Sequence, residues 1–263
     1  MEDLDPPREV PGAADDILRT LEIHGLTWDG PVLYQSSRLD AYQAALEWLI
    51  DAGLAYPCCC SRKQVMESGK RGELGMIYNG RCRHDPRPCA GRNPAWRVIT
   101  HDEPTAFDDL RRGHYAQRLA SELGDFVIKR ADGFFAYQLA VVVDDAWQSI
   151  SEVVRGEDLL DNTPRQIHLQ QLLGLATPDY LHLPLVTNEQ GQKLSKQTFA
   201  QPLAPNRRGN NLLTALHHLG IALPASLTKA AVEEILHAAV ERVRQPSWDW
   251  RSIHPRPQQS TSA

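Results

Sequence analysis

The sequence predicts an α/β fold with a parallel sheet, interrupted by a small inserted module and followed by a helical C-terminal segment. Strand-like apolar segments end in charged residues and are followed by helical patterns, which is typical of a parallel sheet with ligand groups at the carboxyl ends of its strands. All five cysteines lie in one window that also holds several glycines and prolines. After Gly209 the pattern becomes helical.

The elements follow in order from these patterns. Apolar periodicity predicts helices over 10–25 and 41–52, the second preceded by a Ser37–Asp40 segment that resembles a capping box. Thr163 and Pro164 suit the cap and first position of a helix that runs to Leu173, and Thr228 suits the cap of a helix over 228–243. A further helix is expected over 211–219, and a loosely held tail from Pro246. Strands are expected over 96–99, 126–129, 134–143, 150–154 and 181–186.

Composition bounds the class of protein. The 263 residues are 42% hydrophobic and 23% charged, which excludes long disorder. A formal net charge of -5 excludes a globally basic nucleic-acid binder but leaves a local basic face open. No apolar run approaches the roughly 20 residues that span a bilayer, and the acidic start MEDLDPPREV does not resemble a signal or transit peptide. We therefore expect a cytoplasmic protein without membrane contact. The sequence does not reveal the oligomeric state, for which a monomer is our default expectation.

The cysteine window predicts a metal site. A strand-like C-x-C places Cys58 and Cys60 on one side and Cys59 on the other. With Cys82 they supply three of the four positions of a tetrahedral, structural zinc site, and the fourth is Tyr78, His84, Cys89 or water. The alternative is a group of free buried thiols. An odd number of cysteines in a reducing compartment argues against disulfides.

Three further groups have side chains suited to binding anions or cations. Lys193 and Lys196 in GQKLSKQ are suited to neutralising triphosphate charge, although most such charge runs are solvated surface loops. Arg155 in VVRGED can bind a carboxylate in bidentate fashion. Without further context, an intramolecular salt bridge from Arg155 to Glu157, Asp158 or Asp144 is slightly favoured over binding of a ligand. The acidic cluster that contains Glu2 can hold an ammonium group, or is simply a frayed terminus.

Taken in order, EDLDPPRE, AYPCCCSR, FAYQLAVVVDD, VVRGEDLL and KLSKQ resemble the catalytic part of class I glutamyl-tRNA synthetases. KLSKQ resembles the KMSKS loop of that family. Only residues 198–263 follow it, too few for the large anticodon-binding domains of the discriminating enzymes. The resemblance is therefore to the short branch of the family, the glutamyl-queuosine tRNA(Asp) synthetases, which activate glutamate with ATP and esterify it to queuosine at the wobble position of tRNA(Asp).

The resemblance implies a role for particular residues. Glu2, Tyr137 and Arg155 match positions that contact glutamate, with Arg155 facing its carboxylate. Lys196 matches the catalytic, ATP-binding lysine of the KMSKS loop, and Lys193 is the other lysine assigned to ATP. Cys58, Cys60, Tyr78 and Cys82 match the family's zinc ligands, which leaves Cys59 and Cys89 outside the site. The implied ligands are L-glutamate, ATP with Mg²⁺, one Zn²⁺ and tRNA(Asp) carrying queuosine, the last contacted through a basic face that includes Arg207 and Arg208.

The resemblance also implies a domain division, and the sequence departs from the family's pattern at its N-terminus. Residues 1–55 and 138–190 correspond to a Rossmann-like catalytic domain, 56–137 to an inserted zinc-bearing domain that resembles an acceptor-binding domain, and 191–263 to the KMSKS-like loop and a C-terminal helical region. The family's R-F-A-P-S-P strand and HIGH-type signature are not found, and Met1 stands where relatives have the isoleucine of R-I-E-D. We expect a start codon assigned too far downstream, since the later motifs are undamaged; a truncated gene is the alternative. The rival functions are a non-catalytic, zinc-bearing tRNA-binding module and a glutamyl-tRNA synthetase fragment.

Overall fold

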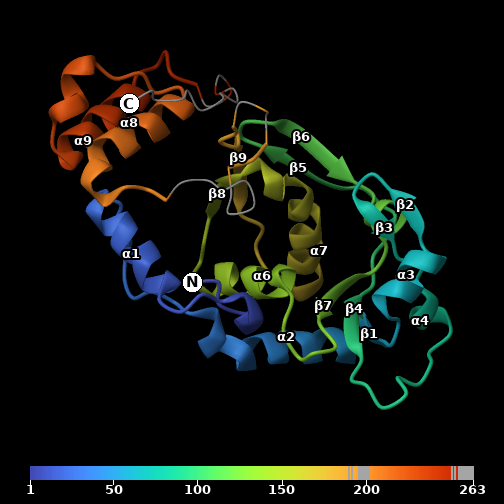
Figure 1. Cartoon of the computed structure of the whole chain (residues 1–263). Coiled ribbons are helices and arrows are strands. Elements are labelled where there is room, and N and C mark those ends of the chain that lie inside the picture. The colour runs from blue at the N-terminus through green and yellow to red at the C-terminus, as the bar shows by residue number, and fades with distance from the viewer. Residues whose placement is uncertain (189, 191, 195–201, 250, 252, 254–263) are drawn as a thin grey trace.

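The computed structural model describes residues 1–188, 190, 192–194, 202–249, 251 and 253 (Figure 1). Its helices are α1 (Ala13–Ile23), α2 (Leu39–Asp51), α3 (Arg62–Ser68), α4 (Arg81–His84), α5 (Leu119–Glu122), α6 (Tyr137–Trp147), α7 (Thr163–Leu173), α8 (Arg208–His218) and α9 (Val232–Val243). Its strands are β1 (Ala55–Cys58), β2 (Lys70–Gly72), β3 (Gly75–Ile77), β4 (Ala95–Val98), β5 (Thr105–Asp109), β6 (Gly113–Gln117), β7 (Phe126–Lys129), β8 (Glu152–Gly156) and β9 (Asp179–Leu183).

The main hydrophobic core lies between a small antiparallel sheet and helices α2, α6 and α7. In that sheet β4 is the middle strand, paired with β1 and β7. Helix α2 turns Tyr42, Leu46 and Leu49 toward the core, each about one turn from the next, as expected of a helix with one apolar face. Fully buried residues from the other elements complete the core: Val98, Ile128, Leu139 and Leu169.

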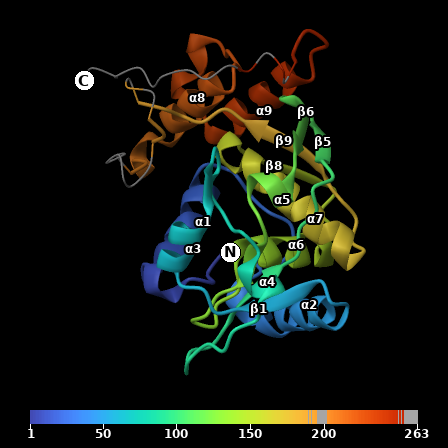
Figure 2. The ribbon, with the colours of Figure 1, turned by 90° about the vertical axis from the view of Figure 1, so that its right-hand side faces the viewer.

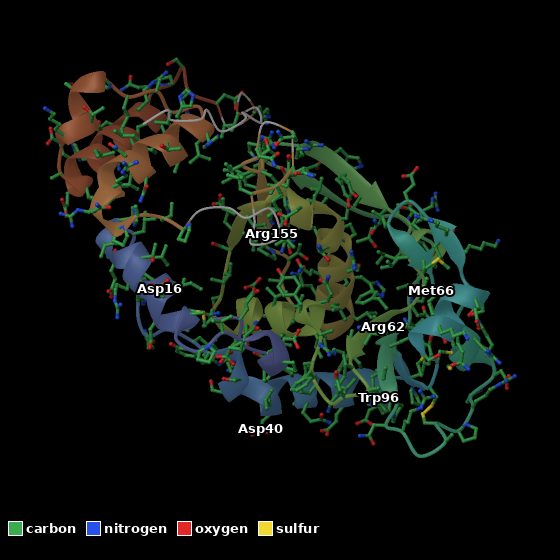
Figure 3. All side chains as sticks on the ribbon, viewed as in Figure 1. Asp16, Asp40, Arg62, Met66, Trp96 and Arg155 are labelled. Carbon is green, nitrogen blue, oxygen red and sulfur yellow. A yellow bond between two sulfur atoms is a disulfide. The ribbon has the colours of Figure 1, made fainter. Side chains whose placement is uncertain are left out.

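The parallel pairing expected from the strand ends is found in β8 and β9. These strands are joined by α7 and pair in a register that places Arg155 beside His182. In the described residues this is the parallel pair, whereas β4 and β7, both predicted as strands, pair antiparallel. Figure 3 shows Arg155 near the centre of the molecule.

The segment 134–143 was expected as a strand, and that prediction is wrong. From Tyr137 it forms helix α6, which buries Gln138, Leu139 and Val142 at helical spacing between α2 and α7. The intrinsic cost of a few valines in a helix is only tenths of a kcal/mol each. Burial of their apolar surface in the core outweighs that cost.

The expected helix caps are also corrected. Ser37 Oγ donates to Tyr34 O instead of capping α2. Thr163 lies inside α7, and its hydroxyl accepts a hydrogen bond from Arg155. Thr228 belongs to the 3-10 helix Ala225–Lys229, and α9 begins four residues after it, at Val232. Ser37 and Thr228 thus belong to short 3-10 helices, Gln35–Arg38 and Ala225–Lys229, and Thr163 serves Arg155 instead of capping a helix.

Between β1 and α6, strands β4 and β7 belong to the core sheet, and the rest of the segment forms two hairpins and three short helices (Figure 1, Figure 2). Hairpin β2–β3 lies near α3 and α4, whereas hairpin β5–β6 runs back to the parallel pair. There the backbone N of Leu110 donates to the carbonyl of Tyr180 at 2.9 Å. The tip of the second hairpin thus contacts β9, far from it in sequence.

Helices α8 and α9 form a separate unit with their own core around Leu212, Leu216 and Ile235. It contacts the end of α1, where Gly25 has a φ of +69° and a Cβ would lie 2.8 Å from Val232. The close approach and the left-handed turn both require glycine there. Ile253 is buried and its carbonyl accepts from Arg111 Nε at 3.0 Å, so this point of the predicted loose tail is held.

No helix in the described part of the chain is long and apolar enough to cross a membrane.

Candidate active site and metal centre

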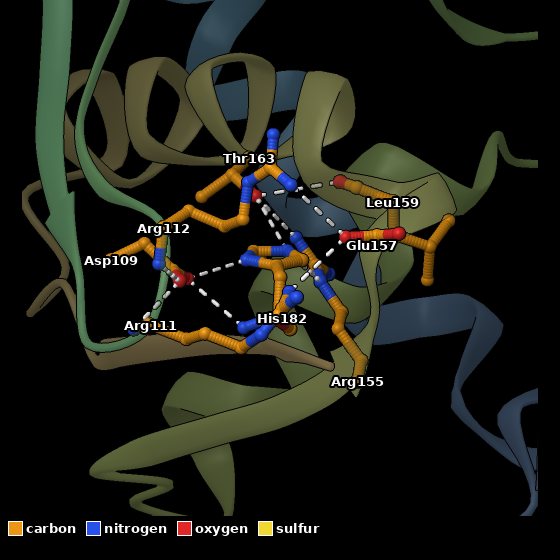
Figure 4. Close-up of polar contacts among 8 residues, drawn as sticks. All are labelled: Asp109, Arg111, Arg112, Arg155, Glu157, Leu159, Thr163 and His182. Atoms are coloured by element: carbon orange, nitrogen blue, oxygen red, sulfur yellow. Dashed lines mark hydrogen bonds and ion pairs between the residues drawn. The ribbon is translucent and has the colours of Figure 1, made fainter. Parts of the chain in front are cut away.

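Arg155, at the carboxyl end of β8, is held by three neutral side chains, two of which, His182 and Thr163, are drawn in Figure 4. Its Nε donates to His182 Nε2 at 3.1 Å and its Nη2 to Thr163 Oγ1 at 2.8 Å, while Nη1 lies 3.5 Å from the Tyr137 hydroxyl. None of these partners neutralises the guanidinium. The half-buried cation therefore keeps its charge for a ligand carboxylate.

The intramolecular salt bridge considered for Arg155 is not formed among the described residues. All three carboxylates named as candidates pair with other cations. Glu157 pairs with Arg111 and Arg112, Asp158 with Lys193, and Asp144 with Arg38.

Glu2 and Asp145 place negative charge near this arginine. Both line a pocket with Asp144, Gln35 and other residues. Burial raises the pKa of Asp145 to about 6; Arg155 opposes this shift, and Asp144 and Glu2 add to it. Desolvation likewise raises the pKa of Glu2, and Arg155 again opposes this increase. One cation beside two carboxylates can receive a zwitterion, with the carboxylate of the ligand at the cation and its ammonium at the acids.

The rest of the N-terminal acidic cluster has structural partners. Asp3 accepts from the backbone N and the hydroxyl of Ser36 at 2.9 and 2.5 Å. Asp5 pairs with Arg130 at 3.4 Å. The alternative of a frayed terminus is therefore wrong for these residues.

Lys193 begins the predicted phosphate-binding loop. It forms an isolated β-bridge with Thr187, and its ammonium contacts Asp158. This ion pair fixes the start of the loop close to β8, on whose end Arg155 lies. Lys196 falls outside the described residues.

The thiols of Cys58, Cys60 and Cys82 form one cluster, with all three sulfur atoms within 4.8 Å of one another. The Tyr78 hydroxyl lies 3.4 Å from Cys58 Sγ and 3.7 Å from Cys60 Sγ, and it accepts from the Cys82 backbone N at 2.9 Å. Burial opposes ionisation of Cys82, but hydrogen bonds from Tyr78 and Cys60 prevail and lower its pKa to about 7. Four donors that converge in this way can hold a metal ion.

Arg97 is a neighbour of this cluster that the sequence did not single out. Its Nε donates to Cys58 Sγ at 3.2 Å, and its guanidinium lies 3.9 Å from the centre of the Tyr78 ring. Three thiolates and a phenolate around a divalent ion carry excess negative charge. A fixed cation at this distance stabilises that charge.

Cys59 and Cys89 are joined by a disulfide, which corrects the expectation that both are free. Cys59 is not part of the three-thiol cluster, and β1 already ends at Cys58. The loop that follows α4 returns and brings Cys89 to Cys59, with Arg92 Nη2 donating to the Cys59 carbonyl at 3.4 Å. The path of this loop is set by the tertiary fold, so the number and spacing of the cysteines could not predict the disulfide.

Arg207 and Arg208 are both exposed, at the start of α8. Their place on a tRNA-binding face stays a prediction.

The structure adds two residues to the site, His182 and Asp109, which sequence reasoning missed. His182 lay within the expected strand 181–186, of which β9 (Asp179–Leu183) contains residues 181–183, and it was interpreted only as part of that strand. Asp109 stands at the end of β5, far from Arg155 in sequence. The available signal was a histidine among apolar residues in LHLPLV, whereas Asp109, in FDDLRR, offered none.

Residues 1–218 match the family model for tRNA synthetases class I (E and Q), catalytic domain. The chain belongs to this family. The arrangement described above, with Arg155 at the end of a strand and a lysine-bearing loop beside it, is consistent with this family.

Curated members of the family are similar to this chain along nearly all of it. A glutamyl-Q tRNA(Asp) synthetase of Neisseria meningitidis serogroup C is 56% identical over 255 residues, which cover 96% of this chain and 84% of the relative. Another with that name, from Dechloromonas aromatica, is 50% identical over 256 residues, covering 97% and 81%.

Solved structures show the same fold. A glutamate tRNA ligase from Elizabethkingia meningosepticum, in complex with its amino acid, superposes with a TM-score of 0.71 at 23% identity, covering 97% of this chain. A glutamate-tRNA synthetase from Elizabethkingia anophelis superposes with a TM-score of 0.72, also at 23% identity, covering 98%. The chain spans 58% and 60% of their lengths. The class I synthetase catalytic fold is thereby established.

Proposed function

We propose that this protein activates L-glutamate with ATP and transfers it to queuosine at the wobble position of tRNA(Asp). The observation that carries the proposal is the 50–56% identity, over nearly the whole chain, to relatives named glutamyl-Q tRNA(Asp) synthetase. The site geometry supports the same reaction, because it offers a cation and acids for an amino acid next to a lysine-bearing loop.

Arg155 binds the carboxylate of glutamate that does not react, and Tyr137 borders it. Glu2, with Asp145 beside it, faces the ammonium group. A bound ammonium lowers the pKa of these acids and so opposes the effect of their burial. The other carboxylate of glutamate is then directed toward ATP.

That carboxylate attacks the α-phosphorus of ATP, forming glutamyl-adenylate and releasing pyrophosphate. Lys196 and Lys193 stabilise the charge that develops on the phosphates, and Mg²⁺ accompanies ATP. A hydroxyl of queuosine then attacks the activated carbonyl and AMP leaves. The protein contributes positioning and charge stabilisation, with no covalent intermediate on a side chain.

Cys58, Cys60, Cys82 and Tyr78 would hold a structural Zn²⁺. Support comes from the donor set, since three convergent thiols are typical of zinc and the phenol completes four. The buried apolar cluster around the site is small, so bound metal stabilises this part of the fold.

Two assays test the proposal. Glutamate-dependent ATP–pyrophosphate exchange without tRNA should be positive, and its absence would favour a non-catalytic tRNA-binding module. Transfer of labelled glutamate should require queuosine in tRNA(Asp). Transfer to tRNA(Glu) and independence of queuosine would instead identify a glutamyl-tRNA synthetase fragment.

A further inference from the structure

A buried chain of hydrogen bonds links the β5–β6 hairpin to Arg155 (Figure 4). It begins at Asp109, whose side chain is inaccessible to solvent. Asp109 Oδ1 accepts from the backbone N of Arg111 at 3.0 Å and of Arg112 at 2.7 Å. Oδ2 accepts from the backbone N of His182 at 3.0 Å and lies 2.7 Å from its Nδ1. Three backbone N–H groups thus donate to one carboxylate and fix its position.

This contact decides which nitrogen of His182 carries the proton. Both oxygens of the Asp109 carboxylate already act as acceptors for backbone N–H groups, so Nδ1 takes the donor role toward Oδ2. Nε2 lies 3.1 Å from Arg155 Nε, and a guanidinium only donates, so Nε2 must accept. The imidazole is thus neutral and protonated at Nδ1. Its burial, which lowers the pKa of His182, acts in the same direction.

The two acceptors that face Arg155 hold one edge of its guanidinium. His182 Nε2 accepts a hydrogen bond from Arg155 Nε, and Thr163 Oγ1 accepts one from Arg155 Nη2. The ring of Tyr180 is stacked on His182, at 6.2 Å and 15°, and limits its rotation. The orientation of Arg155 is therefore set without a counter-charge, which would compete with a bound carboxylate.

The hairpin tip is itself fastened to the catalytic strands. Arg111 Nη1 donates to the His182 carbonyl at 3.0 Å and contacts Glu157 Oε2 at 3.1 Å. Asp109 therefore cannot move relative to β9 without breaking several hydrogen bonds.

We propose that His182, held by Asp109, is a positioning residue that presents the guanidinium of Arg155 to the substrate carboxylate. This rests on the proposed function, in which Arg155 binds glutamate. It assigns to the inserted segment, through the tip of one hairpin, a part in amino-acid recognition. His182 itself does not touch the substrate.

The test compares four variants by ATP–pyrophosphate exchange at varied glutamate. His182→Leu removes the acceptor, and Asp109→Asn favours the opposite tautomer, which would point an N–H at Arg155. Both should raise KM for glutamate by about 10-fold to 100-fold, the usual effect of losing a hydrogen bond to a charged group. KM for ATP should stay unchanged. His182→Gln, whose amide oxygen can replace Nε2, should recover part of the loss.

Phe107→Leu is the matched control, because Phe107 packs against His182 but makes none of these hydrogen bonds. It should leave KM for glutamate near the wild-type value. If Phe107→Leu and His182→Leu raise both KM values equally, His182 is only structural and the inference is overturned.

A spectroscopic measurement separates this inference from the proposed function. Nitrogen chemical shifts of the histidine side chains should show His182 protonated at Nδ1 in the wild type and at Nε2 in Asp109→Asn. A wild type without glutamate-dependent exchange would refute the function, and the inference with it. A wild type with exchange whose His182 is protonated at Nε2, or on both nitrogens, would refute the inference alone.

Discussion

Replacing Cys58 by serine should remove zinc from the protein, whereas replacing its neighbour Cys59 should not. The two cysteines are adjacent in sequence but have different partners. Cys58 Sγ belongs to the three-thiol cluster, and Cys59 is bonded to Cys89 outside it. The pair of variants thus differs in ligand geometry and in little else.

The expected loss of zinc affinity and of stability is large because few other interactions stabilise the segment around the three thiols. The buried part of its apolar cluster is Cys58, Tyr78 and Cys82, and complete burial of a large apolar side chain contributes only about 1.5–3 kcal/mol. Structural zinc contributes about 10 kcal/mol or more in small metal-dependent domains. Loss of a direct ligand should therefore weaken zinc binding by more than the roughly 10-fold to 100-fold that loss of an outer hydrogen bond costs.

The measurements are zinc content and thermal unfolding. Both are made in reducing buffer, so that the Cys59–Cys89 bond is open throughout. The wild type and Cys59→Ser should each retain about one zinc per chain. Cys58→Ser should retain little and unfold at lower temperature. Equal zinc loss in both variants, or a wild type without zinc, would refute the assignment.

Four other predictions follow from the site. Arg155→Lys keeps the charge but loses the fork of donors, so KM for glutamate should rise about 10-fold to 100-fold; an unchanged KM would exclude Arg155 from glutamate binding. Lys196→Ala should slow ATP–pyrophosphate exchange by about 100-fold or more, corresponding to about 3 kcal/mol of transition-state stabilisation, and a variant that exchanges at the wild-type rate would contradict that role. The pKa of Asp145 is raised from 3.8 to about 6 in the folded state, so its ionised form destabilises the fold above pH 6 and this effect vanishes below pH 3.8. Asp145→Asn without ligand should therefore raise the melting temperature at pH 8, with the gain shrinking as the pH falls; a gain that grows at low pH would reverse the sign of the argument. Replacing Arg207 and Arg208 by alanine should weaken tRNA binding and reduce its dependence on salt concentration, and an unchanged salt slope in a binding titration would remove both from the interface.

Much of the secondary structure was predictable because it depends on local pattern. The repeat of Tyr42, Leu46 and Leu49 specifies a helix with one buried face, and α2 is that helix. The strand at 126–129 was found with its bounds intact. The error at α6 arose because a valine-rich apolar run suits a buried strand and a buried helix equally, and neighbouring elements decide between them.

The clustering of three thiols was predictable from their spacing. Cys58 and Cys60 do share one cluster with Cys82, although β1 already ends at Cys58. Cys59 shows the limit of this reasoning. It was correctly left out of the cluster, but its disulfide depends on how the loop that carries Cys89 folds back.

The sequence by itself determined the order of the motifs, the amphipathic helices and the residue types that bind carboxylate, phosphate and metal, because all of these are encoded in spacing. Only the tertiary structure decided what Arg155 contacts. Three nearby carboxylates were plausible partners, and each is paired with another cation. Their place is taken by Thr163 and by His182, which Asp109 holds from a distant hairpin. Such contacts depend on how separate elements pack, and sequence spacing carries no record of that packing.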